Sequence, residues 1–89
     1  MKEKFELFLI EKGYRTTTPS GNPSTVYSYL NSIEKVCEWE GINWTELADD
    51  ISKIVVMYDL GGINEELGSK SHKTIINALK RYAEFVKQV

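Results

Sequence analysis

The spacing of apolar residues in two long segments constrains the fold of this chain more than any other feature. In each segment apolar residues recur at intervals of four, three and four, which places them along one face of an α-helix. The two stripes consist of Val26, Leu30, Ile33 and Cys37, and of Ile75, Leu79, Tyr82 and Val86. Since no segment shows the strict alternation of a strand, we expect an all-α protein.

Turn-forming residues set the boundaries of the helices in the first half of the chain. A helix is predicted over about 2–12 because Gly13 stops the apolar pattern, and the loop sequence YRTTTPSGNP follows it. The next helix is predicted over about 24–40. Pro23 suits its first turn, since proline lacks the amide hydrogen that is unpaired there anyway.

Residues that begin or end helices also divide the second half of the chain. A helical region is predicted over about 45–60. It begins with a short helical turn from Thr45 to Ala48, which Thr45 or Asn43 can cap. Asp49 and Asp50 then favour a helix start because acidic side chains suit the positive end of the helix dipole. The sequence GGINEELG predicts a loop with one helical turn, and a last helix is predicted over about 70–87. We therefore expect residues 1–89 to form a single domain, a small bundle of four to five helices.

The sequence gives little support for a membrane, metal-binding or catalytic function. The apolar run IVVMY is far shorter than the roughly 20 residues of a membrane span. Glu6 and Glu11 interrupt the N-terminal segment, so no signal peptide is predicted and a cytoplasmic location is expected. One cysteine, Cys37, and one histidine, His72, do not suffice for a zinc cluster or a catalytic triad. We expect no catalytic residue, metal, cofactor or small-molecule substrate.

Charge is distributed unevenly along the chain. Residues 31–67 hold nine acidic and two basic side chains, whereas residues 68–89 hold five basic and one acidic side chain. On the last predicted helix one face carries Lys73, Asn77, Lys80, Glu84 and Lys87, with Lys70 and Arg81 beside it. Lysines can neutralise phosphates and asparagine can pair with an adenine edge, so this face is a candidate DNA-binding surface.

The outward side of the second predicted helix is polar with few charges. Its outward residues are Ser24, Tyr27, Ser28, Asn31 and Lys35. Short donors of this kind commonly contact phosphate oxygens, although Glu34 and Glu38 limit how closely DNA could approach the far end.

Two sequence blocks, taken in order, resemble a known family. In STVYSYLNSIEKVCEWEGI a threonine, a Tyr-Leu pair, two apolar residues and a tryptophan follow the pattern T-x3-YL-x2-I-x2-V-x2-W, and these are Thr25, Tyr29, Leu30, Ile33, Val36 and Trp39. The second block is DDISKIVVMYDLGG followed by GSKSHKTIINALKRYAEFV. Over roughly residues 3–87 the chain is similar to the N-terminal SAM-like, core-binding domain of phage integrases and other tyrosine recombinases.

The resemblance implies a small helical bundle that clamps one side of a recombination site. In that family the chemistry belongs to a separate C-terminal domain with arginines, a His-x-x-Arg motif and a nucleophilic tyrosine. This chain lacks the motif, because His72 is followed by Lys73, Thr74 and Ile75, and its only arginines are Arg15 and Arg81. A non-catalytic role, with a recombinase catalytic domain as a partner, is what the resemblance implies.

Two functional hypotheses follow. The first is a DNA-binding module whose contacts with duplex DNA are Thr25, Tyr27, Ser28, Asn31, Lys70, Lys73, Asn77, Lys80 and Arg81. Because the pI is near 5.4, binding by the domain alone is expected to be weak. The second is a free-standing helical protein-interaction module of phage or bacterial origin, without DNA binding. It would use the basic helix, an exposed apolar patch near Trp44 and Tyr58, or the acidic residues Glu38, Glu40, Glu46, Asp49 and Asp50.

Overall fold

The structure, a computed structural model, describes residues 1–14 and 25–88, with residues 71 and 72 described by their backbone alone. Its helices are α1 (Lys2–Glu11), α2 (Thr25–Glu40), α3 (Trp44–Asp49), α4 (Ile51–Tyr58), α5 (Glu65–Gly68) and α6 (Lys70–Lys87). These described residues contain no strand, so the predicted all-α class is confirmed. Apart from Tyr14, the predicted loop YRTTTPSGNP lies outside the described residues, as does Ser24.

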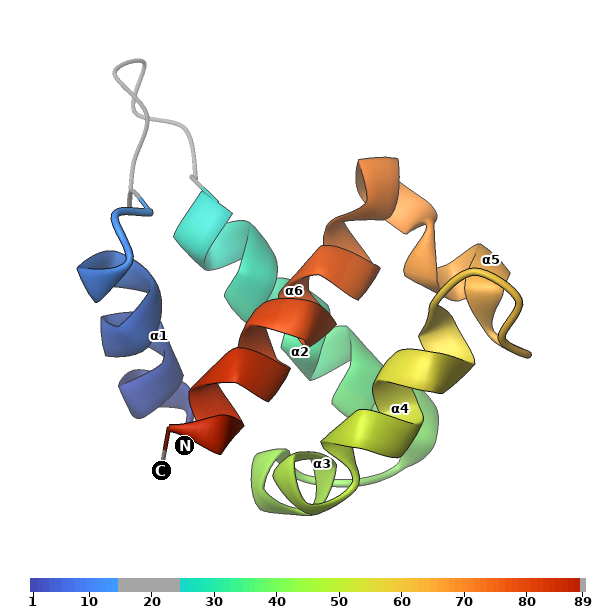
Figure 1. The fold of residues 1–89 in the computed structure, drawn as a ribbon, viewed down its shortest axis with the longest axis horizontal. Coiled ribbons are helices and arrows are strands. Elements are labelled where there is room, and N and C mark those ends of the chain that lie inside the picture. The colour runs from blue at the N-terminus through green and yellow to red at the C-terminus, as the bar shows by residue number, and fades with distance from the viewer. Residues whose placement is uncertain (15–24, 89) are drawn as a thin grey trace.

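Helix α6 is the central element of the bundle. It packs against each of the other five helices, and Figure 1 shows it crossing α2, with α1 on one side and α4 and α5 on the other. All members of the two predicted apolar stripes except Val86 are buried. The buried side chains of α1, α2, α3, α4 and α6 form one core cluster, because each helix turns its apolar face inward.

Aromatic rings fix the end of α6 against α1 and α3. The ring of Phe5 lies 5.0 Å from that of Tyr82, and the ring of Trp44 lies 5.5 Å from Tyr82, both edge to face. Such pairs add about 0.5–1.5 kcal/mol each beyond the area that they bury. The Tyr82 hydroxyl also donates a hydrogen bond to the Trp44 carbonyl at 2.8 Å. Trp44 is therefore half-buried in the core.

The region predicted as helical over 45–60 is divided into two helices. Asn43 caps α3 by a reciprocal pair of hydrogen bonds with Glu46, and this capping box satisfies two free amides. The helical path breaks at Asp50, which has φ −107° and ψ 15°. Aspartate favours helix ends over helix interiors, so Asp49 and Asp50 mark the junction where α4 begins.

A close backbone approach places α5 and the start of α6 beside the end of α4. The backbone amide of Asn64 donates a hydrogen bond to the Met57 carbonyl at 2.8 Å, which folds the loop back onto α4. Gly68 then lies so close to α4 that a Cβ atom there would be 1.9 Å from the Tyr58 carbonyl oxygen. Just beyond it Lys73 has φ 68°, and α6 changes direction near its start (Figure 1). These contacts position the basic face of α6 next to the end of α4.

Candidate nucleic-acid interface

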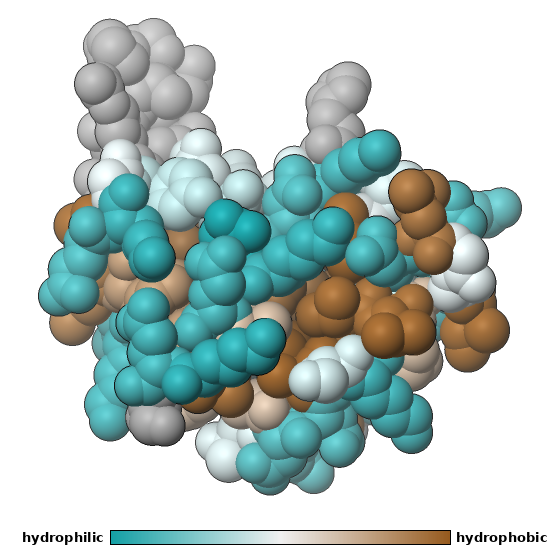
Figure 2. Space-filling model, viewed as in Figure 1, coloured by the Kyte–Doolittle hydropathy of each residue, from teal (hydrophilic) through white to brown (hydrophobic). Residues whose placement is uncertain are grey.

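The predicted basic face of α6 is accessible to solvent. Lys70, Lys73, Asn77 and Lys80 are exposed, and they lie opposite the buried Ile75, Leu79 and Tyr82. This arrangement follows from the amphipathic pattern of α6, whose buried stripe forces the remaining positions outward. Figure 2 shows polar surface along α6, in the middle of the view. The backbone of Lys73 has a left-handed conformation, which costs a non-glycine residue about 1–2 kcal/mol.

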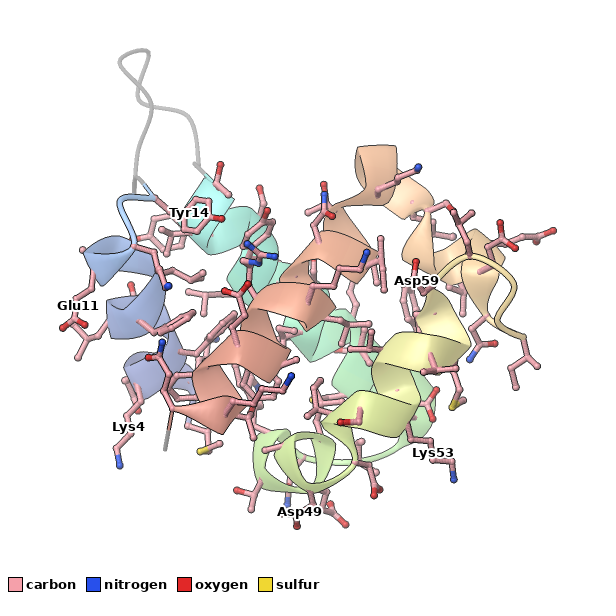
Figure 3. All side chains as sticks on the ribbon, viewed as in Figure 1. Lys4, Glu11, Tyr14, Asp49, Lys53 and Asp59 are labelled. Carbon is pink, nitrogen blue, oxygen red and sulfur yellow. The ribbon has the colours of Figure 1, made fainter. Side chains whose placement is uncertain are left out.

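Acidic neighbours offset part of this positive charge. The Lys80 ammonium lies 3.5 Å from the Asp59 carboxylate, and the Arg81 guanidinium lies 3.1 Å from the Glu84 carboxylate. Figure 3 shows Asp59 at the end of α4. The pKa of Asp59 is lowered, first by the hydrogen bond that it accepts from the Leu60 amide and then by the charges of Lys80 and Lys73. The face is therefore less positive than its sequence alone suggests.

Arg81 stands apart from the lysines. Its side chain is half-buried, whereas the four predicted contacts Lys70, Lys73, Asn77 and Lys80 are exposed. Its charge acts on the phenol of Tyr29 on α2, whose pKa is nonetheless raised, mainly by burial and also by Tyr14. Arg81 is thus near α2 and paired with Glu84, which leaves it less available for a ligand.

A hollow between α4 and α6 gathers three of the predicted residues. Its volume is about 230 Å³, and its lining comprises Tyr58, Asp59, Leu60, Ser69, Lys73, Ile76, Asn77 and Lys80. We call it the α4–α6 hollow. Two ammonium groups and an amide line the same hollow as one carboxylate, so donors for an anion outnumber the competing acid, while the Ser69 hydroxyl donates to the Glu65 carbonyl.

The predicted residues of α2 meet α6 on a different side. Ser28 and Asn31 line a second hollow of about 190 Å³, together with Ser32, Lys35, Thr74 and Ile75. We call it the α2–α6 hollow. Lys73 and Thr74 are adjacent in sequence but line different hollows, so the two halves of the predicted interface meet at the start of α6. Thr25 and Tyr27 are exposed on α2 and line neither hollow.

Several polar residues at these hollows were not among the predicted contacts, namely Tyr58, Asp59 and Ser69 in the first and Ser32, Lys35 and Thr74 in the second. Lys35 follows Asn31 by four positions and Ser28 by seven, so helical spacing could have added it to the site. Ser69 precedes α6 and could have been included as its cap. No pattern in the sequence pointed to Asp59, because only the packing of α4 on α6 brings it to Lys80.

The acidic residues of the second hypothesis have mixed surroundings. Glu40 accepts a hydrogen bond from the buried Tyr58 hydroxyl at 2.7 Å, and Glu46 belongs to the capping box of α3. Both therefore have structural roles. Glu38, Asp49 and Asp50 are exposed.

Exposed apolar residues lie at the end of α4, close in sequence to Tyr58, near which an apolar patch was predicted. Tyr58 is buried and Trp44 packs in the aromatic cluster. Instead Val56, Leu60 and Ile63 are exposed to 69%, 73% and 85%, and we call them the apolar tip. Figure 2 shows apolar surface on the side of the molecule where α4 and the following loop lie. Leu60 also lines the α4–α6 hollow, so the tip adjoins the basic face.

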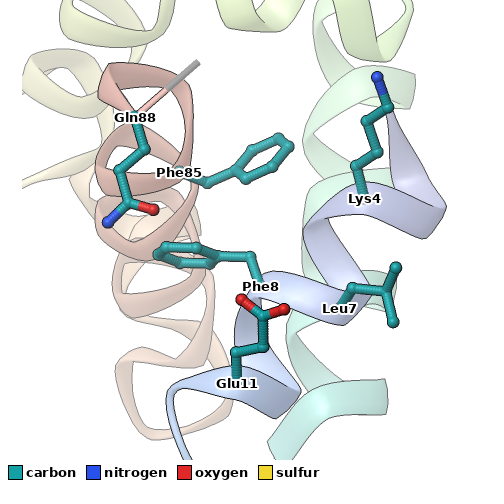
Figure 4. Close-up of a pocket in the computed structure, with 6 residues that line it drawn as sticks. All are labelled: Lys4, Leu7, Phe8, Glu11, Phe85 and Gln88. Atoms are coloured by element: carbon teal, nitrogen blue, oxygen red, sulfur yellow. The ribbon is translucent and has the colours of Figure 1, made fainter.

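A further hollow lies between α1 and the end of α6. It measures about 280 Å³ and is lined by Lys4, Leu7, Phe8, Glu11, Phe85 and Gln88 (Figure 4). Phe8 and Phe85 point into it from the aromatic cluster, with Glu11 and Gln88 at its edge. Since its floor is built from core rings, it offers an apolar surface with few converging polar groups.

Within the described residues, no group of three or more His, Cys, Asp or Glu side chains is placed to hold a metal ion. Burial raises the pKa of the Cys37 thiol to about 11, so this cysteine is a poor nucleophile near neutral pH. No helix in the described part of the chain has the length and apolar character needed to cross a membrane.

The structure thus defines a small all-α bundle with a basic helical face flanked by two polar hollows. Comparisons of the chain with protein-family models, with curated proteins and with solved structures gave no match.

Proposed function

We propose that this protein is a non-catalytic DNA-binding module of the cytoplasm, similar in role to the core-binding domain of an integrase. Phosphates of a duplex would contact Lys70, Lys73 and Lys80 on α6 and the polar side chains of α2. A recombinase catalytic domain would be its functional partner. The observation that carries the proposal is that exposed lysines and short polar donors from α2 and α6 meet at the start of α6. Positively charged and polar groups on adjoining helices are what backbone contacts with DNA require.

Affinity for DNA should be low and strongly dependent on salt. Each phosphate contact contributes about −0.9 to the slope of log affinity against log salt concentration. Four contacts would therefore weaken binding by about a thousandfold between about 20 mM and 150 mM salt. The excess of acidic residues elsewhere on the chain opposes binding further.

The test is an NMR titration of the labelled domain with a 20-base-pair duplex at about 20 mM and 150 mM salt. Shifts should be confined to residues 25–35 and 69–81 and should fade at the higher concentration. Lys73→Gln should reduce the salt slope by about one unit. Lys53→Gln is the matched control, since Lys53 is also an exposed lysine but lies on α4 and lines neither polar hollow. An equal effect of the two substitutions, or no shifts at low salt, would refute DNA binding at this face.

The second candidate is a protein-interaction module, and the apolar tip is the observation that favours it. Exposed apolar side chains that adjoin one another commonly mark protein contacts. A photo-crosslinker at Ile63 that captures a defined protein partner, while duplex DNA causes no amide shifts at low salt, would favour this function. The same crosslinker at Leu7, an exposed leucine on α1, provides the control for unspecific capture.

A further inference from the structure

We propose that the α4–α6 hollow is a phosphate subsite in which Asp59 competes with the phosphate for Lys73 and Lys80. The inference rests on the proposed DNA-binding function for the source of the phosphate, and it adds which groups hold the phosphate and which group opposes it. The negative charge of Asp59 would then lower the affinity of this face for an anion.

The hollow has the donors that a phosphate group needs. Lys73 and Lys80 supply ammonium groups and Asn77 supplies an amide, whereas the Ser69 hydroxyl already donates to the Glu65 carbonyl at 2.9 Å. Its volume of about 230 Å³ leaves space for a phosphate and part of the attached sugar. Two positive charges against one negative charge leave the hollow with an excess of positive charge, which favours an anionic ligand.

The contact between Asp59 and Lys80 is loose enough to be exchanged. Its N to O distance is 3.5 Å, whereas a charge-assisted hydrogen bond typically measures about 2.7–2.9 Å. Both side chains keep more than a third of their surface exposed, and water screens an exposed ion pair so that it stabilises the protein little. A phosphate could therefore replace the carboxylate at Lys80 at little cost.

Asp59 itself is held in place independently of the lysines. One carboxylate oxygen accepts a hydrogen bond from the Leu60 amide at 2.8 Å, at the end of α4. The negative charge consequently stays at the hollow when Lys80 turns to another anion. Because the competitor is fixed, each phosphate bound here must overcome its repulsion.

Asp59→Asn is the variant that tests this inference. Asparagine keeps the oxygen that accepts from Leu60 and removes only the charge, so the fold should be retained and a melting curve checks this. In NMR titrations with inorganic phosphate, the amides of Ser69, Lys73 and Asn77 should shift at a several-fold lower concentration than in the unmodified protein. With duplex DNA, the salt slope should become steeper by about one unit because one further phosphate contact forms.

Two further variants make the test specific. Glu66→Gln removes an equal charge from an exposed residue of α5 that does not line the hollow, and it should change phosphate binding far less. Adding Lys80→Gln to Asp59→Asn should remove the gain in phosphate affinity.

Equal gains from Asp59→Asn and Glu66→Gln, or no phosphate-induced shifts at the hollow in Asp59→Asn, would overturn the proposal. If phosphate shifts the hollow amides in Asp59→Asn while no variant binds duplex DNA, the subsite stands and the proposed DNA-binding function fails.

Discussion

Replacement of Gly68 by alanine should destabilise the protein strongly, because this glycine is the point at which α5 meets α4. An added Cβ atom would lie 1.9 Å from the Tyr58 carbonyl oxygen and 2.9 Å from its carbonyl carbon, whereas ordinary contact begins at 3.4 Å. The obstacle is backbone, so no side chain can turn aside and α5 itself must move away from α4. Overpacking usually costs about 1–3 kcal/mol, and we expect about 3 kcal/mol here.

Thermal and urea unfolding followed by circular dichroism measure this loss. In a domain of this size each kcal/mol lowers Tm by about 4–8 °C, so Gly68→Ala should lower it by about 12 °C or more. Gly41→Ala is the control, because Gly41 has φ 68° but open space around its Cβ position. That substitution carries only the left-handed strain of about 1–2 kcal/mol. If Gly68→Ala lowers the free energy of unfolding no more than Gly41→Ala does, the inference that α5 lies in close contact with the backbone of α4 is wrong.

Four further predictions concern the core, one helix end and the pH dependence of stability. Tyr82→Phe keeps the ring packing but leaves the Trp44 carbonyl without its hydroxyl donor, so it should lower the free energy of unfolding by about 1–2 kcal/mol. Urea unfolding measures this loss, and no measurable change would refute the hydrogen bond. Asn43→Ala removes the capping box of α3 and should cost about 1 kcal/mol, which Asn43→Asp should largely restore. Iodoacetamide at pH 8 should modify Cys37 much more slowly in the folded protein than in urea, since its pKa is raised to about 11 by burial; equal rates would contradict this. Because folding also raises the pKa of Tyr58 and of Tyr82, the folded state holds these protons more tightly, so the free energy of unfolding should fall as pH rises above about 9.

The course of the long helices could be predicted from the sequence because helical periodicity is a local property. The buried stripes of α2 and α6, with Leu30 and Leu79 at their centres, follow from the 3.6-residue turn alone. The same periodicity turned Asn77 and Lys80 outward, whereas Lys73 lies where α6 changes direction. The division between α3 and α4 was also predictable in part, since the sequence indicated a short capped turn from Thr45 to Ala48 and a helix start at Asp49 and Asp50, whereas the structure places the break at Asp50.

The surroundings of the candidate site depended on contacts between residues far apart in the chain. Periodicity does not specify the angles at which helices cross, and these angles decide which side chains meet. Only the packing of α4 on α6 brings Asp59 to Lys80, and only the crossing of α2 and α6 brings Asn31 and Thr74 to one hollow. The sequence by itself thus determined that the chain forms amphipathic helices and that α6 presents lysines to solvent, because both follow from local spacing. The tertiary structure decided which acid opposes those lysines and which polar groups join them.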